Sequence, residues 1–188
     1  QVCQHGREDA PLYVLDMFEF VHVFVGSLEG AVHRVIGNVE KERLVRVPVD
    51  EVHGLDALDG LWERADFLVV CVPLLESTRS LVSGAAFEKL KPSTVVIDVS
   101  RGGVVDEAAL ISALDSGAIQ GAGLDVFSTE PLAKGHRLWD YQNVIVTPHC
   151  SAVYAGWDLK SVEMFADNLT RYRHGETLSN IVDPLRGY

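Results

Sequence analysis

From about residue 65 onward, short apolar runs alternate with amphipathic stretches. Apolar runs that lack a strict polar alternation predict strands at 65–73, 94–100, 119–127 and 143–148. Apolar positions at helical spacing predict helices at 83–90, at 106–117 and from near 151 or 157 to Gly175. Because strands and helices alternate, we expect a parallel α/β sheet whose strands are covered on both faces.

The helix at 106–117 carries its own start and stop signals. Asp106 is placed to cap the amino end, and Gly117 to end the helix in a left-handed conformation. Leu110 and Leu114 fall on one face, which predicts that this face packs on the sheet.

Polar side chains follow three of the strands at the point where each strand ends. Arg101 stands behind VVIDVS, Asp125 and Glu130 end or follow the next strand, and His149 follows the last. The carboxyl ends of parallel strands share one edge, so one crevice could hold all four. A histidine, a carboxylate that stabilises its charged form and an arginine that binds an anion suit acid–base chemistry on an acidic substrate. Each residue also has an ordinary alternative, such as a capped loop histidine or an arginine in a tight turn.

Two glycines, Gly102 and Gly103, directly follow Arg101. They remove side chains from the carboxyl end of a predicted strand. We therefore expect another backbone or a ligand to approach closely there.

Composition excludes several classes of partner. The chain has 188 residues, enough for one domain or one domain and part of a second, and its net charge is −11 from 27 acidic and 16 basic residues. We therefore expect neither a nucleic-acid nor a membrane partner. Three cysteines without a CxxC motif support neither a disulfide framework nor a cysteine zinc site, and they favour a reducing, cytoplasmic location. No metal site is predicted.

Five segments together resemble the NAD(P)-dependent D-isomer-specific 2-hydroxyacid dehydrogenases: ADFLVVCVPLLESTRSLV, VVIDVSRGGVVDEAAL, GAGLDVFSTEPL, LWDYQNVIVTPH and NIVDPLRGY. The resemblance covers residues 48–188. It implies a doubly wound, Rossmann-like nucleotide-binding domain with remnants of a flavodoxin-like substrate domain. It also implies hydride transfer between a nicotinamide cofactor and a 2-oxo or D-2-hydroxy acid, in a homodimer.

The same resemblance implies roles for the polar residues. Arg101 corresponds to the arginine that binds the substrate carboxylate, His149 to the general acid/base, and Glu130 to the carboxylate paired with that histidine. Asp125 resembles the aspartate that holds the nicotinamide carboxamide. The residues assigned to the cofactor, NAD or NADP, are Gly26, Pro73, Ser100, Arg101, Asp125 and His149.

The chain departs from the family pattern at several positions. Leu75 stands where threonine is usual, and Asp98 where asparagine is usual. Ser151 and Ala152 stand where glycines are common. None of these changes removes a catalytic role, but Leu75 is expected to alter contacts to the cofactor.

The dinucleotide fingerprint G-x-G-x-x-G is the largest departure. The only candidate carries Gly26 and Gly30, and the 17 residues from Val21 to Gly37 are too few for a strand–helix–strand unit of about 30. This indicates either a truncated protein or pieces of a longer chain joined across gaps; we favour the second and expect breaks inside 1–48. The expected domains are 1–20, a substrate-domain fragment; 21–150, the dinucleotide-binding domain, incomplete near 26–45; and 151–188, a helix and tail that cross back to the substrate domain.

Cofactor preference is predicted from the end of the second strand. A site that prefers NAD places Asp or Glu there to bind the ribose hydroxyl. Behind RVIG stand Asn38 and Val39, with no acid at the expected place, and beyond them come Glu40, Lys41, Glu42 and Arg43. This pattern predicts that NADP is used at least as well as NAD.

Two other functions stay open. One is formate dehydrogenase, a relative in which glutamine typically partners the histidine, so Glu130 argues against it. The other is a dinucleotide-sensing binding module, like the transcriptional corepressors that share this fold. Turnover of simple 2-oxo acids would separate an enzyme from such a module.

Overall fold

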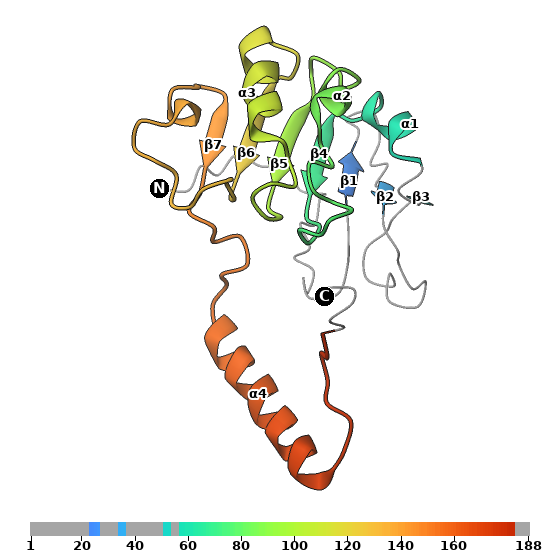
Figure 1. Cartoon of the computed structure of the whole chain (residues 1–188), viewed down its shortest axis with the longest axis vertical. Coiled ribbons are helices and arrows are strands. Elements are labelled where there is room, and N and C mark those ends of the chain that lie inside the picture. Colours follow the sequence, from blue (N-terminus) through green and yellow to red (C-terminus); the bar gives the residue numbers. More distant parts are fainter. Residues whose placement is uncertain (1–22, 27–33, 37–50, 54–56, 183–188) are drawn as a thin grey trace, which may run out of the picture.

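A computed structural model describes residues 23–26, 34–36, 51–53 and 57–182. Its strands form one sheet in the order β3-β2-β1-β4-β5-β6-β7 (Figure 1). The strands are β1 Val23–Gly26, β2 Arg34–Ile36, β3 Glu51–His53, β4 Phe67–Val70, β5 Val95–Asp98, β6 Gly121–Leu124 and β7 Val144–Val146. The helices are α1 Asp59–Trp62, α2 Gly84–Phe87, α3 Glu107–Ser116, the 3-10 helix η3 Arg137–Trp139, and α4 Trp157–His174.

Strands β4 to β7 are parallel and nearly in step. Val70 pairs with Asp98, Asp98 with Leu124, and Leu124 with Val146, so the last residues of the four strands form one row across the sheet. This confirms the parallel α/β sheet predicted from the alternating pattern. Each strand is shorter than its apolar run, because the run continues into the loop that carries polar side chains.

Strand β1 departs from the parallel arrangement. It pairs antiparallel with both β2 and β4, and Gly26 lies opposite Phe67, the first residue of β4. Only seven residues separate Gly26 from Arg34, whereas a parallel connection needs about a dozen or more. Chain length therefore dictates the antiparallel pairing of β1 with β2. The predicted breaks within 1–48, the fragment 1–20 and the cofactor-selecting positions 38–43 lie largely or wholly outside the described residues.

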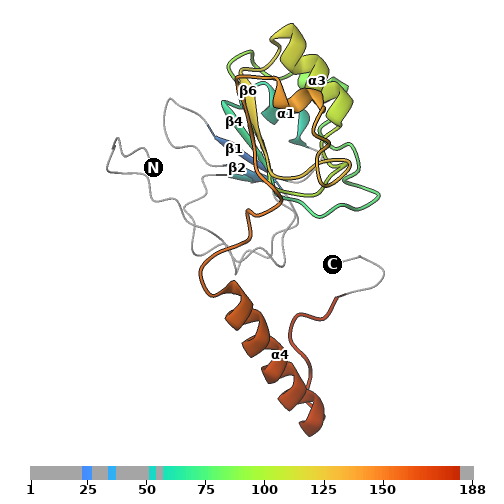
Figure 2. The same ribbon diagram turned by 90° about the vertical axis from the view of Figure 1, so that its left-hand side faces the viewer.

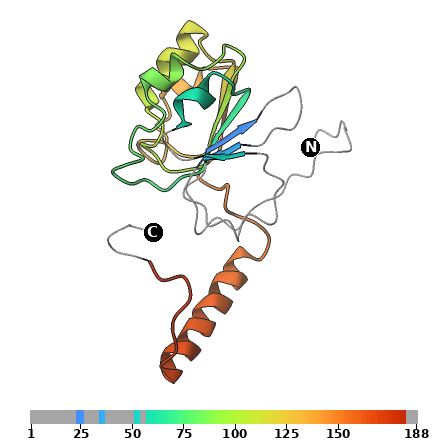
Figure 3. The same cartoon turned by 90° about the vertical axis from the view of Figure 1, so that its right-hand side faces the viewer.

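The core lies between the sheet and helices α1 to α3, which pack on the same face of the sheet (Figures 2 and 3). Leu68 and Val96 of the sheet are fully buried, and Leu110 and Leu114 of α3 pack in the same core. Alternate strand residues point to the other face, where Phe67 is 38% exposed. The strands were predicted to be covered on both faces, but the described helices cover one.

Helix α3 has both of its predicted end signals. The Asp106 carboxylate accepts a hydrogen bond from the Ala109 N–H at 3.0 Å. Gly117 ends the helix with a φ of 68°, in the left-handed region that glycine adopts without strain. Because Asp106 caps the amino end, the helix starts directly after the loop that contains Arg101.

Helix α4 extends away from the sheet in all three views (Figures 1 to 3). None of its residues is buried, and Phe165 and Leu169 are exposed on its apolar side. The following segment runs back beside the helix, where the Ser179 N–H donates to Asn168 Oδ1 at 2.9 Å. No helix in the described part of the chain is long and apolar enough to cross a membrane.

Candidate active site

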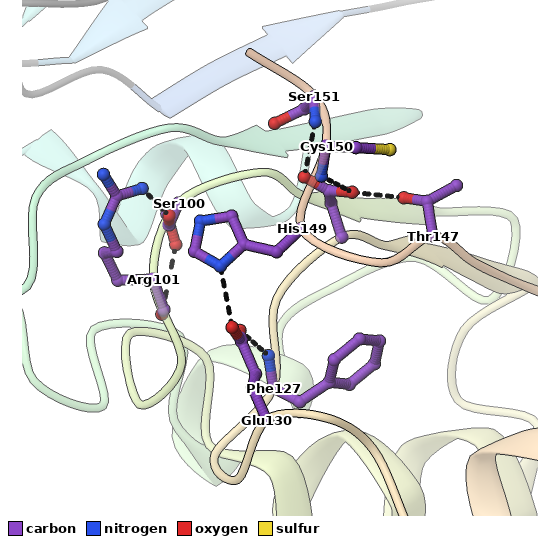
Figure 4. A network of polar contacts seen from close by, with 9 residues as sticks. Ser100, Arg101, Phe127, Glu130, Thr147, His149, Cys150 and Ser151 are labelled. Carbon is purple, nitrogen blue, oxygen red and sulfur yellow. Dashed lines mark hydrogen bonds and ion pairs between the residues drawn. The ribbon is translucent and has the colours of Figure 1, made fainter. Parts of the chain in front are cut away.

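The carboxyl edge of the four parallel strands gathers most of the polar residues singled out from the sequence. Glu130 and His149 are in contact there, and Arg101 lies at the same edge, on the loop after β5 (Figure 4). Pro73 follows β4 at the same edge, because β4 is parallel to β5. Gly26 lies at the opposite edge, beside the start of β4, so the structure does not bring it to the others.

His149 contacts Glu130 directly. His149 Nδ1 lies 2.7 Å from Glu130 Oε2, with the two side chains 41% and 34% exposed. The second carboxylate oxygen, Oε1, accepts a hydrogen bond from the Phe127 N–H at 3.0 Å. The hydrogen bond from His149 is the main cause that lowers the pKa of Glu130, and the Phe127 N–H adds to it against a smaller effect of burial. Since Nδ1 is engaged, Nε2 is the ring nitrogen that can hand a proton to a substrate.

Residues 147–151, here called the His149 loop, are held by Asp125. One Asp125 oxygen accepts hydrogen bonds from the Thr147 hydroxyl and the Cys150 N–H, and the other accepts one from the Ser151 N–H at 2.8 Å. His149 has a φ of 52°, a left-handed conformation that non-glycine residues seldom adopt. Contacts on both sides of His149 therefore hold it in an unfavourable backbone conformation.

These contacts keep Asp125 charged. Burial alone would raise its pKa, but the hydrogen bonds from Thr147, Cys150 and Ser151 together outweigh burial and lower the pKa to about 2. The carboxylate consequently stabilises the His149 loop above its ordinary pKa of about 4, and this effect is lost as the pH falls toward 2. The resemblance assigns Asp125 to the nicotinamide carboxamide; in this structure both oxygens bind the His149 loop.

Arg101 stands at the surface while the residue before it is buried. Arg101 Nη1 donates to the Ser100 carbonyl at 2.6 Å, which uses one of the five N–H donors of the guanidinium. The Ser100 side chain is turned inward, and its hydroxyl donates to Asp98. Of this pair, Arg101 is therefore the residue that presents donors at the edge.

The close approach of another backbone explains why the residue after Arg101 is a glycine, Gly102. A Cβ added to it would lie 1.8 Å from the carbonyl oxygen of Phe127, a distance that no packed structure allows. The expectation that another backbone comes close here is confirmed. This contact joins the loop that carries Arg101 to the segment that carries Glu130.

The loop after β4 is organised by Thr78, a residue that the sequence did not single out. The buried Thr78 hydroxyl donates to the Pro73 carbonyl at 2.6 Å and accepts from the Leu75 N–H at 2.8 Å. The Pro73 carbonyl is thus already hydrogen-bonded. The apolar side chain of Leu75 is half-buried, and its backbone N–H donates to the Thr78 hydroxyl.

Two other residues that hold the loops of the site were not singled out from the sequence, Thr147 and Glu107. Thr147 could have been found as a hydroxyl one residue after a strand, in the motif VTPH. Glu107 accepts a hydrogen bond from the Ser128 N–H at 3.1 Å and thereby ties α3 to the segment before Glu130. No local signal marks Glu107, since its partner lies 21 residues away.

The arrangement presents hydrogen-bond donors at the edge of the sheet. Within the described residues no three His, Cys, Asp or Glu side chains form a group that could hold a metal. Arg101 and His149 are exposed donors, whereas Glu130 and Asp125 already have partners. Ligands of parallel α/β sheets bind at this edge. The described residues do not provide a pyrophosphate loop, because Gly26 lies at the other edge.

Comparisons with known proteins agree with this geometry. The family model described as D-isomer specific 2-hydroxyacid dehydrogenase, NAD binding domain, matches residues 28–151. Glyoxylate/hydroxypyruvate reductase B of Klebsiella pneumoniae is 42% identical over 127 residues, which is 68% of this chain and 39% of that protein.

Two solved structures are similar over the same region. A D-isomer specific 2-hydroxyacid dehydrogenase from Xanthobacter autotrophicus Py2, in complex with NADPH and MES, is 43% identical with a TM-score of 0.69, covering 74% of this chain and 45% of that one. An NADPH-dependent glyoxylate/hydroxypyruvate reductase from Sinorhizobium meliloti, in complex with NADP and sulfate, is 36% identical with a TM-score of 0.68, covering 76% and 47%. In each comparison the match spans less than half of the relative.

The family model matches more than half of the chain. The matched region includes the parallel strands that carry Arg101, Glu130 and His149 at one edge. This chain belongs to the D-isomer specific 2-hydroxyacid dehydrogenases, with residues 28–151 matching their NAD-binding domain.

Proposed function

We propose that the protein containing this chain transfers hydride between a nicotinamide cofactor and a 2-oxo acid, giving a D-2-hydroxy acid, or runs the reverse reaction. The observation that carries the proposal is the contact of 2.7 Å between His149 Nδ1 and Glu130 Oε2, beside Arg101 at the ligand-binding edge of the sheet. A bound reduced nicotinamide would supply the hydride.

In this proposal His149 supplies the proton that the reduction of a ketone requires. The carbonyl oxygen gains negative charge as the hydride reaches carbon, and a protonated His149 donates from Nε2. Glu130 holds Nδ1 and stabilises the charged ring, because opposite charges in contact favour the ionised forms. Asp125 fixes the backbone on both sides of the ring, so the nitrogen that donates is held in place.

Arg101 binds the substrate carboxylate. A guanidinium can grip a carboxylate through two parallel charge-assisted hydrogen bonds, which sets both position and orientation. With the carboxylate on Arg101, the neighbouring carbonyl would lie toward His149, since the two side chains gather at one edge (Figure 4).

Substrates and cofactor follow from the relatives. Relatives named glyoxylate/hydroxypyruvate reductase make glyoxylate and hydroxypyruvate the first substrates to test. A relative solved with NADPH, and the absence of an acid at Asn38 and Val39, favour NADPH at least as much as NADH.

We expect the complete protein to oxidise NADPH in the presence of glyoxylate or hydroxypyruvate, at a rate at least equal to that with NADH. Steady-state absorbance measurements with each cofactor, and with formate and NAD as a negative control, test this. No turnover of glyoxylate, hydroxypyruvate or pyruvate would refute the enzyme and leave a dinucleotide-sensing module. A strong preference for NADH would refute the cofactor choice alone.

Replacing Glu130 by glutamine should change the pH dependence of turnover. The amide keeps the shape of the side chain but removes the charge that stabilises protonated His149. We therefore expect the alkaline limb of the kcat profile to move to lower pH. Measuring kcat of the parent and of Glu130→Gln between pH 5 and 10 tests this prediction. Superimposable profiles would contradict the role of Glu130.

Three predictions about the whole protein accompany the proposal. We propose that residues 151–188 pack on a substrate domain, which would cover the exposed apolar side of α4 around Phe165. We also propose that the protein is a homodimer and that it acts in the cytoplasm. Solution size and cell fractionation are the corresponding measurements.

A further inference from the structure

Asp98, the last residue of β5, is a buried acid three positions before Arg101. Only 3% of it is exposed, and it lies behind the ligand-binding edge rather than on it. Its Oδ1 accepts two hydrogen bonds from Ser100, one from the N–H at 3.0 Å and one from the hydroxyl. Both donors of one residue are thus fixed by one carboxylate oxygen.

The contact chain continues from Ser100 to the guanidinium. The Ser100 carbonyl accepts from Arg101 Nη1 at 2.6 Å. Asp98 holds the N–H and the side chain of Ser100, and the carbonyl that meets Arg101 lies one backbone torsion, the ψ of Ser100, beyond them. The two hydrogen bonds of Asp98 thus anchor the residue whose carbonyl accepts from Arg101.

We propose that Asp98 is a positioning residue that acts through Ser100 to orient Arg101 and so sets the affinity for the carboxylate of the 2-oxo acid. The inference rests on the proposed function, in which Arg101 binds that carboxylate. It gives a reason for an acid at a position where the resembled family usually has asparagine. A charged acceptor binds the Ser100 donors more strongly than an amide oxygen does.

The surroundings of Asp98 make this link sensitive to pH. The titratable groups near Asp98 are Cys71 after β4, Asp125 after β6, and Glu107 of α3, which lines the same small cavity. Burial, and to a lesser extent the charge of Asp125, raise the pKa of Asp98 to about 6 against the hydrogen bonds from Ser100. Below this pH the carboxyl gains a proton and becomes a weaker acceptor, so Arg101 should be held less firmly.

The experiment compares variants of the complete protein by the KM for glyoxylate and the KM for NADPH. We expect Asp98→Asn and Ser100→Ala each to raise the glyoxylate KM by about tenfold near pH 7.5, the factor that one hydrogen bond to a charged group contributes. The glyoxylate KM should rise severalfold more than the NADPH KM, since in the proposed function the contact chain ends on the arginine that binds the substrate carboxylate. Ser100→Ala keeps the backbone N–H bond to Asp98 and serves if Asp98→Asn does not fold.

Asp66→Asn is the matched control, because Asp66 is also a buried acid, pairs with Lys91, and lies at the opposite end of β4. It should leave the glyoxylate KM unchanged. The parent KM for glyoxylate should rise as the pH falls below about 6, and this rise should be absent in Asp98→Asn. A purely structural role would lower stability without producing either the KM split or the altered pH dependence.

Arg101→Lys separates failure of this inference from failure of the proposed function. If Arg101→Lys raises the glyoxylate KM while Asp98→Asn and Ser100→Ala do not, Asp98 does not position Arg101. If no protein turns over, glyoxylate binding in the presence of NADP, measured by calorimetry, provides the same comparison as Kd values. Equal losses of glyoxylate and NADPH affinity would also overturn the inference.

Discussion

Replacing His149 by alanine is expected to lower kcat for 2-oxo acid reduction by about 10²- to 10⁴-fold, the usual contribution of general acid catalysis. The expected loss is large because the neighbouring groups at this edge cannot substitute for the imidazole. Glu130 is held as an anion by its contacts, and Asp125 has its pKa lowered to about 2. Neither carries a proton near neutral pH, and arginine does not release one.

Steady-state kinetics and a fluorescence titration with NADPH test this prediction together. Cofactor affinity should survive in His149→Ala, since the loop backbone stays bound to Asp125. His136→Ala is the matched control, because His136 also lies near a carboxylate, with Nε2 3.4 Å from Glu107 Oε1. The control should keep turnover near that of the parent. If His149→Ala reduces every 2-oxo acid at the parent's rate, His149 is not the acid.

Replacing Gly102 by alanine is expected to destabilise the fold and disturb the site together. The new Cβ would lie 1.8 Å from the Phe127 carbonyl oxygen and 2.5 Å from its carbon. Both are backbone atoms, so the strain cannot be relieved by turning a side chain. Overpacking usually costs about 1–3 kcal/mol of unfolding free energy, and a backbone clash belongs at the upper end. The Phe127 N–H binds Glu130, so moving Phe127 would also weaken the contact to His149.

Denaturant titration and kinetics of the same preparations measure both effects. Gly135→Ala is the matched control, because a Cβ there meets no atom within 4 Å and its backbone conformation is ordinary. The control should stay within about 0.5 kcal/mol of the parent. A Gly102→Ala protein with the parent's midpoint and turnover would show that the two loops do not need this close approach.

Sequence patterns were sufficient to predict those features that depend on interactions between residues close together in the chain. The ends of α3 were predictable because the Asp106 cap and the left-handed Gly117 act within a few residues of the helix. The parallel strands β4 to β7 were predictable because apolar runs alternated with helices. That Arg101 and His149 share one edge then follows from parallel geometry, since carboxyl ends meet on the same side.

Sequence patterns did not predict the direction of β1, because the pairing of a strand depends on the length of its connections and on the neighbouring elements. The seven residues between β1 and β2 are too few for a parallel connection, but the direction of β1 beside β4 depends on how these two strands pair in the sheet. An antiparallel β1 carries Gly26 to the edge opposite the candidate site, although its sequence context suggested a cofactor loop. Strand propensity is the same for either direction, so only the pairing could place Gly26.

The sequence by itself determined strands β4 to β7, helices α2, α3 and α4, their order along the chain, and the chemical groups that follow these strands. Only the tertiary structure decided what each group contacts: Glu130 with His149 across 19 residues, Asp125 with the His149 loop across 25 and 26, and Gly102 against Phe127. The reason is physical. Helix caps and apolar periodicity arise between near neighbours in the chain, whereas these contacts exist only after separate strands have paired and brought their loops together.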